Sequence, residues 1–110
     1  MTAAVWRVRD RTTFAELRAD GRRARSGPLG VTWRAEPDGT PPRVAFGLPR
    51  SVGSAVVRNR LRRQLRALVG EASLPAGAYL VRVAPDAVGV PAAELRRHVA
   101  ALAAAVGNAR

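Results

Sequence analysis

Arginine is concentrated in one short stretch of this chain, and its side chains there are suited to binding a polyanion. Five of the nine residues from position 58 to 66 are arginine, and a single asparagine stands among them. At 3.6 residues per turn, the stretch and its flanks form a helix with one apolar side and one basic side. Guanidinium is planar, permanently charged and forked, so it suits bidentate phosphate contact and stacking on bases. The apolar positions are Val57, Leu61, Leu65, Leu68 and Val69.

The net charge of the whole chain indicates the same class of partner. There are 19 basic residues, all of them arginine, and 8 acidic residues, so the formal net charge is +11. Seven arginines and no acidic residue lie between Asp38 and Glu71, which gives that segment a charge of +7. Charge on this scale favours nucleic acid, or less often an anionic membrane surface, and it makes binding steeply dependent on salt.

The sequence lacks the residues that catalytic and metal-binding sites require. The chain has no cysteine, which excludes disulfides, thiolate metal sites and cysteine nucleophiles. Its one histidine, His98, lies beside Arg96 and Arg97 and is expected on the solvated surface. The carboxylates are scattered, and the segment from Ser51 to Ser54 could cradle one phosphate but lacks the ending of a P-loop. We therefore expect neither a catalytic group nor a metal site in the protein itself.

The chain is long enough for a single domain with a modest core. Hydrophobic residues make up 47% of its 110 positions. No apolar run approaches the roughly 20 residues of a membrane span, and the first ten residues lack the apolar centre of a signal peptide. We expect a cytoplasmic protein with one domain over residues 1–110, an N-terminal arm over about 1–10 and a frayed tail over 107–110.

Apolar periodicity and turn residues predict six elements. The predicted helices span residues 12–20, 52–69 and 91–107. The predicted strands span residues 29–34, 44–48 and 79–84, with the second antiparallel to the first. A capping box of Thr13 and Glu16 would open the first helix, Gly21 would end it, and Gly70 would end the second; residues 22–28 would form a basic loop. The order α-β-β-α-β-α predicts an α+β fold, a single-domain sandwich of helices on a small mixed sheet.

The arginine helix carries a specific motif as well as charge. A glycine, a small residue and Ala-Val precede Arg-Asn-Arg, and a basic pair and a further arginine follow. These positions are Gly53, Ser54, Ala55, Val56, Arg58, Asn59, Arg60, Arg62, Arg63 and Arg66. The motif resembles the signature of the protein subunit of bacterial ribonuclease P. The spacing of Phe14 and Gly21 and the order of elements match that family too, so the resemblance covers residues from about 7 to 106.

The resemblance implies a noncatalytic subunit of a ribonucleoprotein. The family protein binds the catalytic RNA of ribonuclease P, which uses magnesium ions (Mg2+) to remove the 5′ leader from precursor tRNA, and it holds the leader in a cleft between the sheet and the first helix. The resemblance also implies a left-handed β-α-β crossover at the arginine helix, although general chirality favours a right-handed one. The residues implied to contact the catalytic RNA are Arg50, Arg58, Asn59, Arg60, Arg62, Arg63 and Arg66. The residues expected in the leader cleft are Phe14, Arg18, Arg22 and Thr32.

This chain departs from the family pattern in the cleft. Arg18 stands where a second aromatic of the first helix is common, and Thr32 stands where an aromatic of the first strand is common. Trp33 is adjacent, but one step along a strand turns a side chain to the other face, so Trp33 is expected in the core. We therefore expect leader binding to depend more on Arg18, Arg22 and phosphate contact than on base stacking.

Other functions share part of this pattern. A helix-turn-helix DNA-binding domain also presents a basic helix, but such domains are usually all-helical, and the alternating segments here predict strands. A ribosomal or general RNA-binding protein would share both the charge and the fold, so only the partner separates it. A membrane-binding helix would need large aromatic anchors, which the apolar side lacks. Two residues keep two interpretations each: Phe14 lines the cleft or packs in the core, and Asn59 contacts RNA or bonds a loop or a backbone carbonyl beside the helix.

Overall fold

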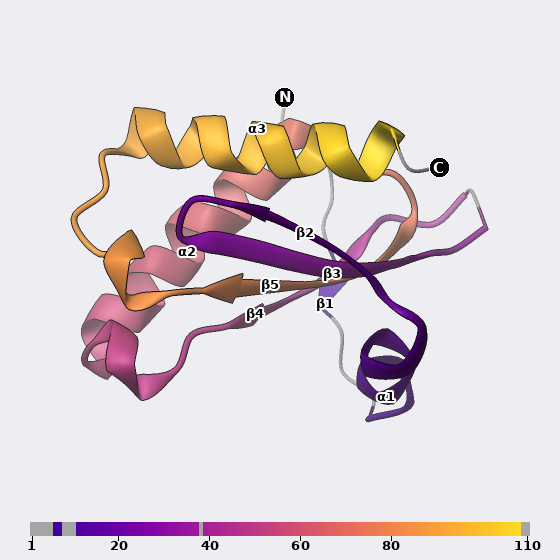
Figure 1. Cartoon of the computed structure of the whole chain (residues 1–110), viewed down its shortest axis with the longest axis horizontal. Helices are drawn as coiled ribbons and strands as arrows, with labels where there is room; N and C mark the ends of the chain where they lie inside the picture. The colour runs from indigo at the N-terminus through magenta and orange to yellow at the C-terminus, as the bar shows by residue number, and fades with distance from the viewer. Residues whose placement is uncertain (1–5, 8–10, 38, 109–110) are drawn as a thin grey trace.

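A computed structural model describes residues 6–7, 11–37 and 39–108, which form one sheet with helices on both faces (Figure 1). The strands are β1 (Trp6–Arg7), β2 (Arg22–Ser26), β3 (Leu29–Ala35), β4 (Arg43–Gly47) and β5 (Gly77–Val83). The helices are α1 (Arg11–Asp20), α2 (Ala55–Ala72) and α3 (Ala92–Asn108), with short 3-10 turns η1 (Arg50–Val52) and η2 (Pro85–Ala87). The strand order is β1-β4-β5-β3-β2. β1 and β5 are parallel to β4, and β3 is antiparallel to β5 and to β2.

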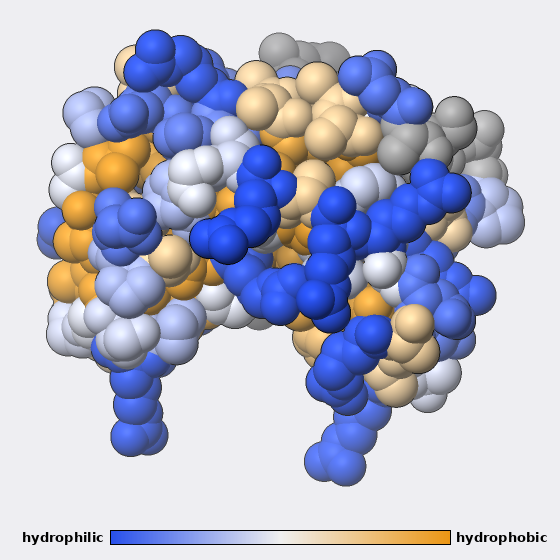
Figure 2. Space-filling view, in the orientation of Figure 1, coloured by the Kyte–Doolittle hydropathy of each residue, from blue (hydrophilic) through white to orange (hydrophobic). Residues whose placement is uncertain are grey.

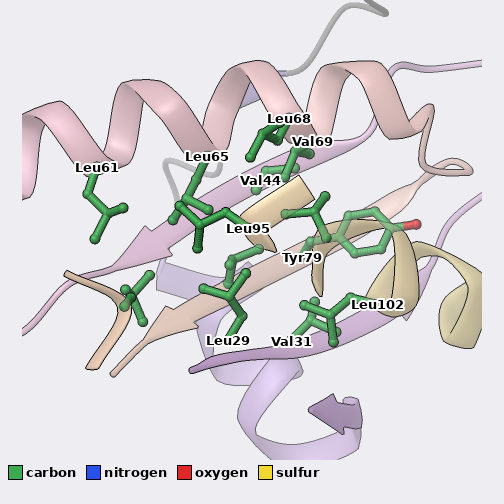
Figure 3. Packing of buried hydrophobic residues seen from close by; sticks show 14 of the residues in the cluster. Leu29, Val31, Val44, Leu61, Leu65, Leu68, Val69, Tyr79, Leu95 and Leu102 are labelled. Carbon is green, nitrogen blue, oxygen red and sulfur yellow. The ribbon is translucent and has the colours of Figure 1, made fainter. Parts of the chain in front are cut away.

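The core lies between the sheet and the two helices that cover one of its faces. α2 and α3 pack together on this face, and α1 packs on the other (Figure 1). Figure 3 shows Leu61 and Leu65 of α2 pointing toward the sheet, where Val44 and Tyr79 belong to the same buried cluster. Tyr79 is fully buried, and its hydroxyl donates a hydrogen bond of 2.6 Å to the carbonyl oxygen of Pro75. The apolar side of the arginine helix is thus buried, which turns its basic side outward.

Alternation along β3 separates the two faces of the sheet. Leu29, Val31 and Trp33 are buried in the core, as predicted for Trp33, while Gly30 and Thr32 lie on the other face. The predicted order is present as α1, β3, β4, α2, β5 and α3, and the predicted α+β fold is confirmed. β4 runs antiparallel to β3, as predicted, but β5 lies between them. β4, α2 and β5 form the β-α-β unit, and the handedness of its crossover stays a prediction.

Two strands are missing from the sequence prediction. Residues 22–28 form β2 and a tight turn into β3, so the prediction of a loop there is wrong. β2 is an edge strand whose Arg22, Arg23 and Arg25 are all exposed, which is why it shows no apolar alternation. β1 lies in the predicted N-terminal arm and pairs with β4. The remaining residues of that arm lie outside the described part of the chain.

The first helix begins earlier than predicted. α1 starts at Arg11, so Thr13 lies within its first turn. Thr13 is only 4% exposed, and its hydroxyl accepts a hydrogen bond of 3.3 Å from Nη1 of Arg43. The prediction that Thr13 caps this helix is therefore wrong. Gly21 follows the helix as predicted, because its amide donates to the Leu17 carbonyl at 2.9 Å and a Cβ there would collide with that carbonyl oxygen.

The arginine helix is shifted along the chain relative to its predicted bounds. Its N-cap is Ser54, whose hydroxyl accepts a hydrogen bond of 3.3 Å from the amide of Val57. Its C-cap is Ser73, in the left-handed region with a φ of 53°. Gly70, predicted to end the helix, is buried within it. At the other end of the molecule, α3 includes residues 107 and 108 of the predicted tail, and 109–110 lie outside the described residues.

Candidate nucleic-acid interface

The basic side of α2 gathers the residues that the motif selects. Asn59, Arg60 and Arg63 are exposed, and the other three arginines of the motif are half-buried against the rest of the fold. Arg50 is exposed in η1, directly before the helix. The Nε of Arg58 is buried and has no hydrogen-bond partner among the described residues. The structure therefore brings the predicted RNA-contact residues together on one helix and the turn that leads into it.

Two arginines of α2 have partners that restrict their guanidinium groups. Nη1 of Arg62 donates a hydrogen bond of 2.8 Å to Oδ1 of Asn59, one turn earlier on the helix. Cζ of Arg66 lies 5.2 Å from the ring centroid of Phe46 on β4, which is a cation–π contact. Asn59 therefore braces a neighbouring arginine, rather than the loop or backbone carbonyl that the structural interpretation expected. A set of partly fixed guanidinium groups loses less side-chain entropy when it binds phosphates.

A second basic surface lies on the sheet face that α2 and α3 leave open. A hollow of about 1020 Å³ opens on this face at one end of the sheet, where β2, β4 and β5 end and β3 begins. The open face points downward in Figure 1, where α1 lies, and Figure 2 shows hydrophilic side chains projecting below the molecule on both sides of a gap. Among the residues that line the hollow are Gly30, Gly47, Leu80, Arg23, Arg25 and Arg82. The surface therefore combines an apolar floor with guanidinium groups from two strands, β2 and β5.

Strand register decides which arginines of β2 reach the hollow. Arg22 pairs with Trp33, a core residue, whereas Arg23 pairs with Thr32 on the other face. Residues directly opposite each other in antiparallel strands share a face of the sheet. Arg22, predicted for the leader cleft, is therefore on the helix-covered side, and its neighbour Arg23 lies on the side of the hollow. This is a correction to the sequence prediction.

Thr32 lies on the same sheet face but does not line the hollow, and its role differs from the one predicted. It is only 3% exposed, so it offers little surface to a ligand. Its hydroxyl accepts a hydrogen bond of 2.7 Å from Nη2 of Arg82, across the β3–β5 pair. Thr32 thus orients an arginine that the sequence analysis did not select.

The two α1 residues predicted for the cleft lie on the same sheet face but outside the lining of the hollow. Phe14 is half-buried and does not belong to the core cluster found among the described residues, and Arg18 is exposed. An ion pair of 2.5 Å between Glu16 and Arg34 holds α1 against the end of β3 that is farther from the hollow.

Sequence reasoning missed the arginines of the hollow, Arg23, Arg25 and Arg82. A signal was present for two of them, because Arg23 and Arg25 are two residues apart and would share one face of a strand. The signal carries information only if the segment is a strand, and it was predicted as a loop. Arg82 alternates with buried Val81 and Val83 in a strand that was predicted, so its position on the opposite face was available from the alternation.

The histidine is also placed differently from the prediction. His98 is half-buried against the β2–β3 turn, and its Nδ1 lies 2.8 Å from the hydroxyl oxygen of Ser26. Gly27 in that turn has a φ of 56°, and a Cβ there would collide with the imidazole ring. The expectation of a solvated surface residue is wrong, because α3 lies across β2 and carries His98 onto the turn.

Two features are absent from the described part of the chain. Within residues 6–7, 11–37 and 39–108, no three side chains of the His, Asp and Glu types lie close enough to hold a metal ion together. Within the same residues, no helix has the length and apolar character needed to cross a membrane.

Comparison with known proteins identifies the family. The family model of ribonuclease P matches residues 3–107, almost the whole chain. The chain belongs to the ribonuclease P protein family. The ribonuclease P protein component of a Nocardioides species is 45% identical over 102 residues, covering 88% of this chain and 87% of that protein. The component from Thermobifida fusca is 41% identical over 99 residues, covering 81% of this chain and 67% of that protein.

The fold of the ribonuclease P protein family is present throughout the chain. The solved structure of the Staphylococcus aureus RNase P protein superposes with a TM-score of 0.75 at 17% identity and covers 94% of both chains. The resemblance seen in the motif from Gly53 to Arg66 is thus confirmed by the family model and by bacterial relatives over nearly the full length. The chain is a protein component of ribonuclease P, the ribonucleoprotein endoribonuclease of tRNA 5′ maturation.

Proposed function

We propose that this chain binds two RNAs on two separate surfaces. The outer side of α2 binds the catalytic RNA of ribonuclease P, and the hollow on the open sheet face binds the 5′ leader of precursor tRNA. The observation that carries the proposal is the arginine-rich motif on a helix whose opposite side is buried in the core through Leu61, Leu65, Leu68 and Val69. The residues proposed to contact the catalytic RNA are Arg50, Arg58, Asn59, Arg60, Arg62, Arg63 and Arg66.

The role of the α2 surface is electrostatic and organisational. Its guanidinium groups neutralise phosphates of the folded RNA and release condensed counterions, which gives salt-dependent affinity. Phosphate contacts fix the position and register of a protein on RNA rather than reading bases. Magnesium ions held by the RNA supply the hydrolytic chemistry in the holoenzyme. The residues of this chain bind and orient the two RNAs and donate no reactive group.

The hollow is suited to a single RNA strand held by its backbone. Arg23, Arg25 and Arg82 surround a floor of glycine and leucine, and no aromatic residue is found among its described lining residues. Without a stacking platform inside the hollow, phosphate contact dominates, so the leader is held with little preference for its bases. Phe14 and Arg18 of α1 continue the same face, where one base can stack on the exposed part of the Phe14 ring.

The remaining parts of the proposal concern the setting of the protein. The holoenzyme would act in the cytoplasm, where precursor tRNA is made in bacteria. The partners would be RNA alone, with neither a membrane nor a second protein required for binding.

Reconstituted cleavage tests the proposed function. A bacterial ribonuclease P RNA, the purified protein and the mixture of the two are each incubated with precursor tRNA at low magnesium, where the RNA alone is nearly inactive. Activity in the mixture alone would support the subunit role and assign the chemistry to the RNA. Tight binding without restored cleavage would contradict the proposal and indicate a general RNA-binding protein. Leaders of different base composition, cleaved in parallel, test whether the hollow reads the backbone.

A further inference from the structure

The cation–π contact between Arg66 and Phe46 joins the RNA-binding helix to the sheet. Phe46 lies on β4, two residues after the core residue Val44, so its ring is on the face that α2 covers. The ring is partly buried and packs against the core cluster, which holds it in one place. Arg66 lies above this ring, with Cζ 5.2 Å from the centroid.

This arrangement restricts an arginine through the face of its guanidinium group. The flat face of a guanidinium stacks on an aromatic ring, while its N–H donors lie in the plane and point outward from the edges. A long arginine side chain otherwise samples many rotamers, and it loses that freedom when it binds. A stacked guanidinium has lost part of the freedom before RNA arrives.

Arg62 and Arg66 stand four residues apart and therefore on neighbouring turns of the same side of α2. Arg62 is held by Asn59 at 2.8 Å, and Arg66 is held by the Phe46 ring. The guanidinium groups of Arg62 and Arg66 thus lie next to each other, which suits contact with neighbouring phosphates of one RNA strand.

We propose that Phe46 is a positioning residue for RNA binding, which acts by holding the Arg66 guanidinium in the orientation that contacts phosphate. The inference rests on the proposed function, because it concerns the surface that binds the catalytic RNA. Phe46 itself does not contact the RNA. Its ring contributes to affinity only as long as residue 66 is an arginine.

A double-mutant cycle tests this dependence. The dissociation constant for a bacterial ribonuclease P RNA is measured over a salt series for Phe46→Leu, Arg66→Met and the double variant. Phe46→Leu should weaken binding roughly two- to fivefold, the range expected for one cation–π contact near the surface. In the Arg66→Met background the same change should have no further effect. Arg66→Met should lower the salt slope by roughly one unit, whereas Phe46→Leu should leave the slope unchanged.

Two more variants separate positioning from packing. Phe46→Tyr keeps an aromatic ring and should retain the affinity, while Phe46→Met fills a similar volume without a ring and should bind as Phe46→Leu does. Thermal unfolding of each protein reports any destabilisation of the core. An equal decrease in affinity from Phe46→Leu in both backgrounds would overturn the inference, because packing then accounts for it.

The outcome is distinguishable from a failure of the proposed function. If removal of Arg62 and Arg63 leaves the affinity for the RNA unchanged, α2 is not the RNA-binding surface and the proposed function fails. If that removal weakens binding but the cycle shows no coupling, the proposed function stands and the role of Phe46 alone is wrong.

Discussion

The outer side of α2 and the hollow on the open sheet face are both basic surfaces, but they are assembled differently. The α2 surface comes from consecutive residues of one helix, and its arginines lie on a frame fixed by buried leucines. The hollow takes its arginines from β2 and β5, which are separated by about half of the chain and joined only through β3. One surface depends on local periodicity, and the other depends on long-range strand register.

The difference predicts separable functions. Because the surfaces share no side chain and lie on opposite faces of the sheet, a change in one should leave binding at the other nearly intact. Variants that weaken the binding of only one of the two RNAs would support separate binding surfaces. Variants that weaken the binding of both RNAs would contradict them.

The largest effect is expected on the helix. Arg62→Ala combined with Arg63→Ala should weaken binding of ribonuclease P RNA by roughly ten- to a hundredfold, because hydrogen bonds to charged groups commonly contribute about 1.5–3 kcal/mol and salt screens part of this at a surface. The slope of log affinity against log salt should fall by roughly one unit for each phosphate that the protein no longer neutralises. Filter binding over a salt series measures both quantities.

The matched control for this variant lies on α3. Arg96 and Arg97 are exposed, and changing both to alanine removes the same net charge from a different helix, together with the exposed ion pairs of Arg96 with Glu71 and of Arg97 with Glu94. The control should keep the salt slope of the unmodified protein. An unchanged slope in the α2 variant, or equal slopes in the two variants, would show that the α2 arginines do not bind phosphates specifically.

The next effect is expected on the edge strand, where two adjacent arginines lie on opposite faces. Arg23→Gln should weaken holoenzyme binding of precursor tRNA by roughly fivefold, because it removes a charge-assisted hydrogen bond to the leader that salt partly screens at this exposed position. It should leave binding of mature tRNA unchanged. Arg22→Gln has the same charge change on the same strand and should leave the ratio of the two affinities unaltered. Similar ratios for both variants would mean that the hollow does not hold the leader.

A smaller effect is expected at α1. Phe14→Ala should reduce the preference for precursor over mature tRNA by roughly threefold, because a base stacks on the exposed part of a half-buried ring rather than on a full platform. Binding of the catalytic RNA should stay the same. A parallel decrease in both affinities, with a lower melting temperature, would show that Phe14 serves the core.

The smallest effect is expected from a buried hydroxyl. Thr32→Val keeps the shape of the side chain but removes the acceptor for Nη2 of Arg82, so the guanidinium gains freedom. The preference for a leader should fall by roughly twofold, because the guanidinium loses one orienting contact but keeps its charge and its own contact with phosphate. In an Arg82→Gln background the same change should have no further effect. A further decrease in that background would mean that Thr32 binds the leader directly.

Most of the fold was predictable because local patterns in the sequence indicate it. The alternation of Leu29, Val31 and Trp33 predicted the central strand and its buried face, and the spacing of Leu61 and Leu65 predicted the covered side of α2. The family resemblance in the motif predicted the RNA partner. Each of these patterns lies within about twenty consecutive residues, so no knowledge of strand pairing was needed.

The rest of the fold and of the candidate site depended on strand pairing, which no local pattern in the sequence indicates. β2 is an edge strand with charged residues on both faces, so its sequence is indistinguishable from that of a basic loop. The register of β2 against β3 places Arg22 and Arg23 on opposite faces of the sheet, and it thereby identifies the arginines of β2 that line the hollow. The prediction for His98 was wrong for the same reason. His98 packs against a turn that forms only when β2 pairs with β3.

The arginine-rich edge strand also bears on how the free protein behaves before it meets RNA. β2 ends the sheet, and a strand in that position presents unpaired backbone groups to which a second chain could add. Three exposed arginines in five residues make such self-association repulsive. Concentrated salt, which strips RNA from the protein, would screen the same repulsion. Conditions that free this protein from nucleic acid are therefore those in which it is least protected from aggregation.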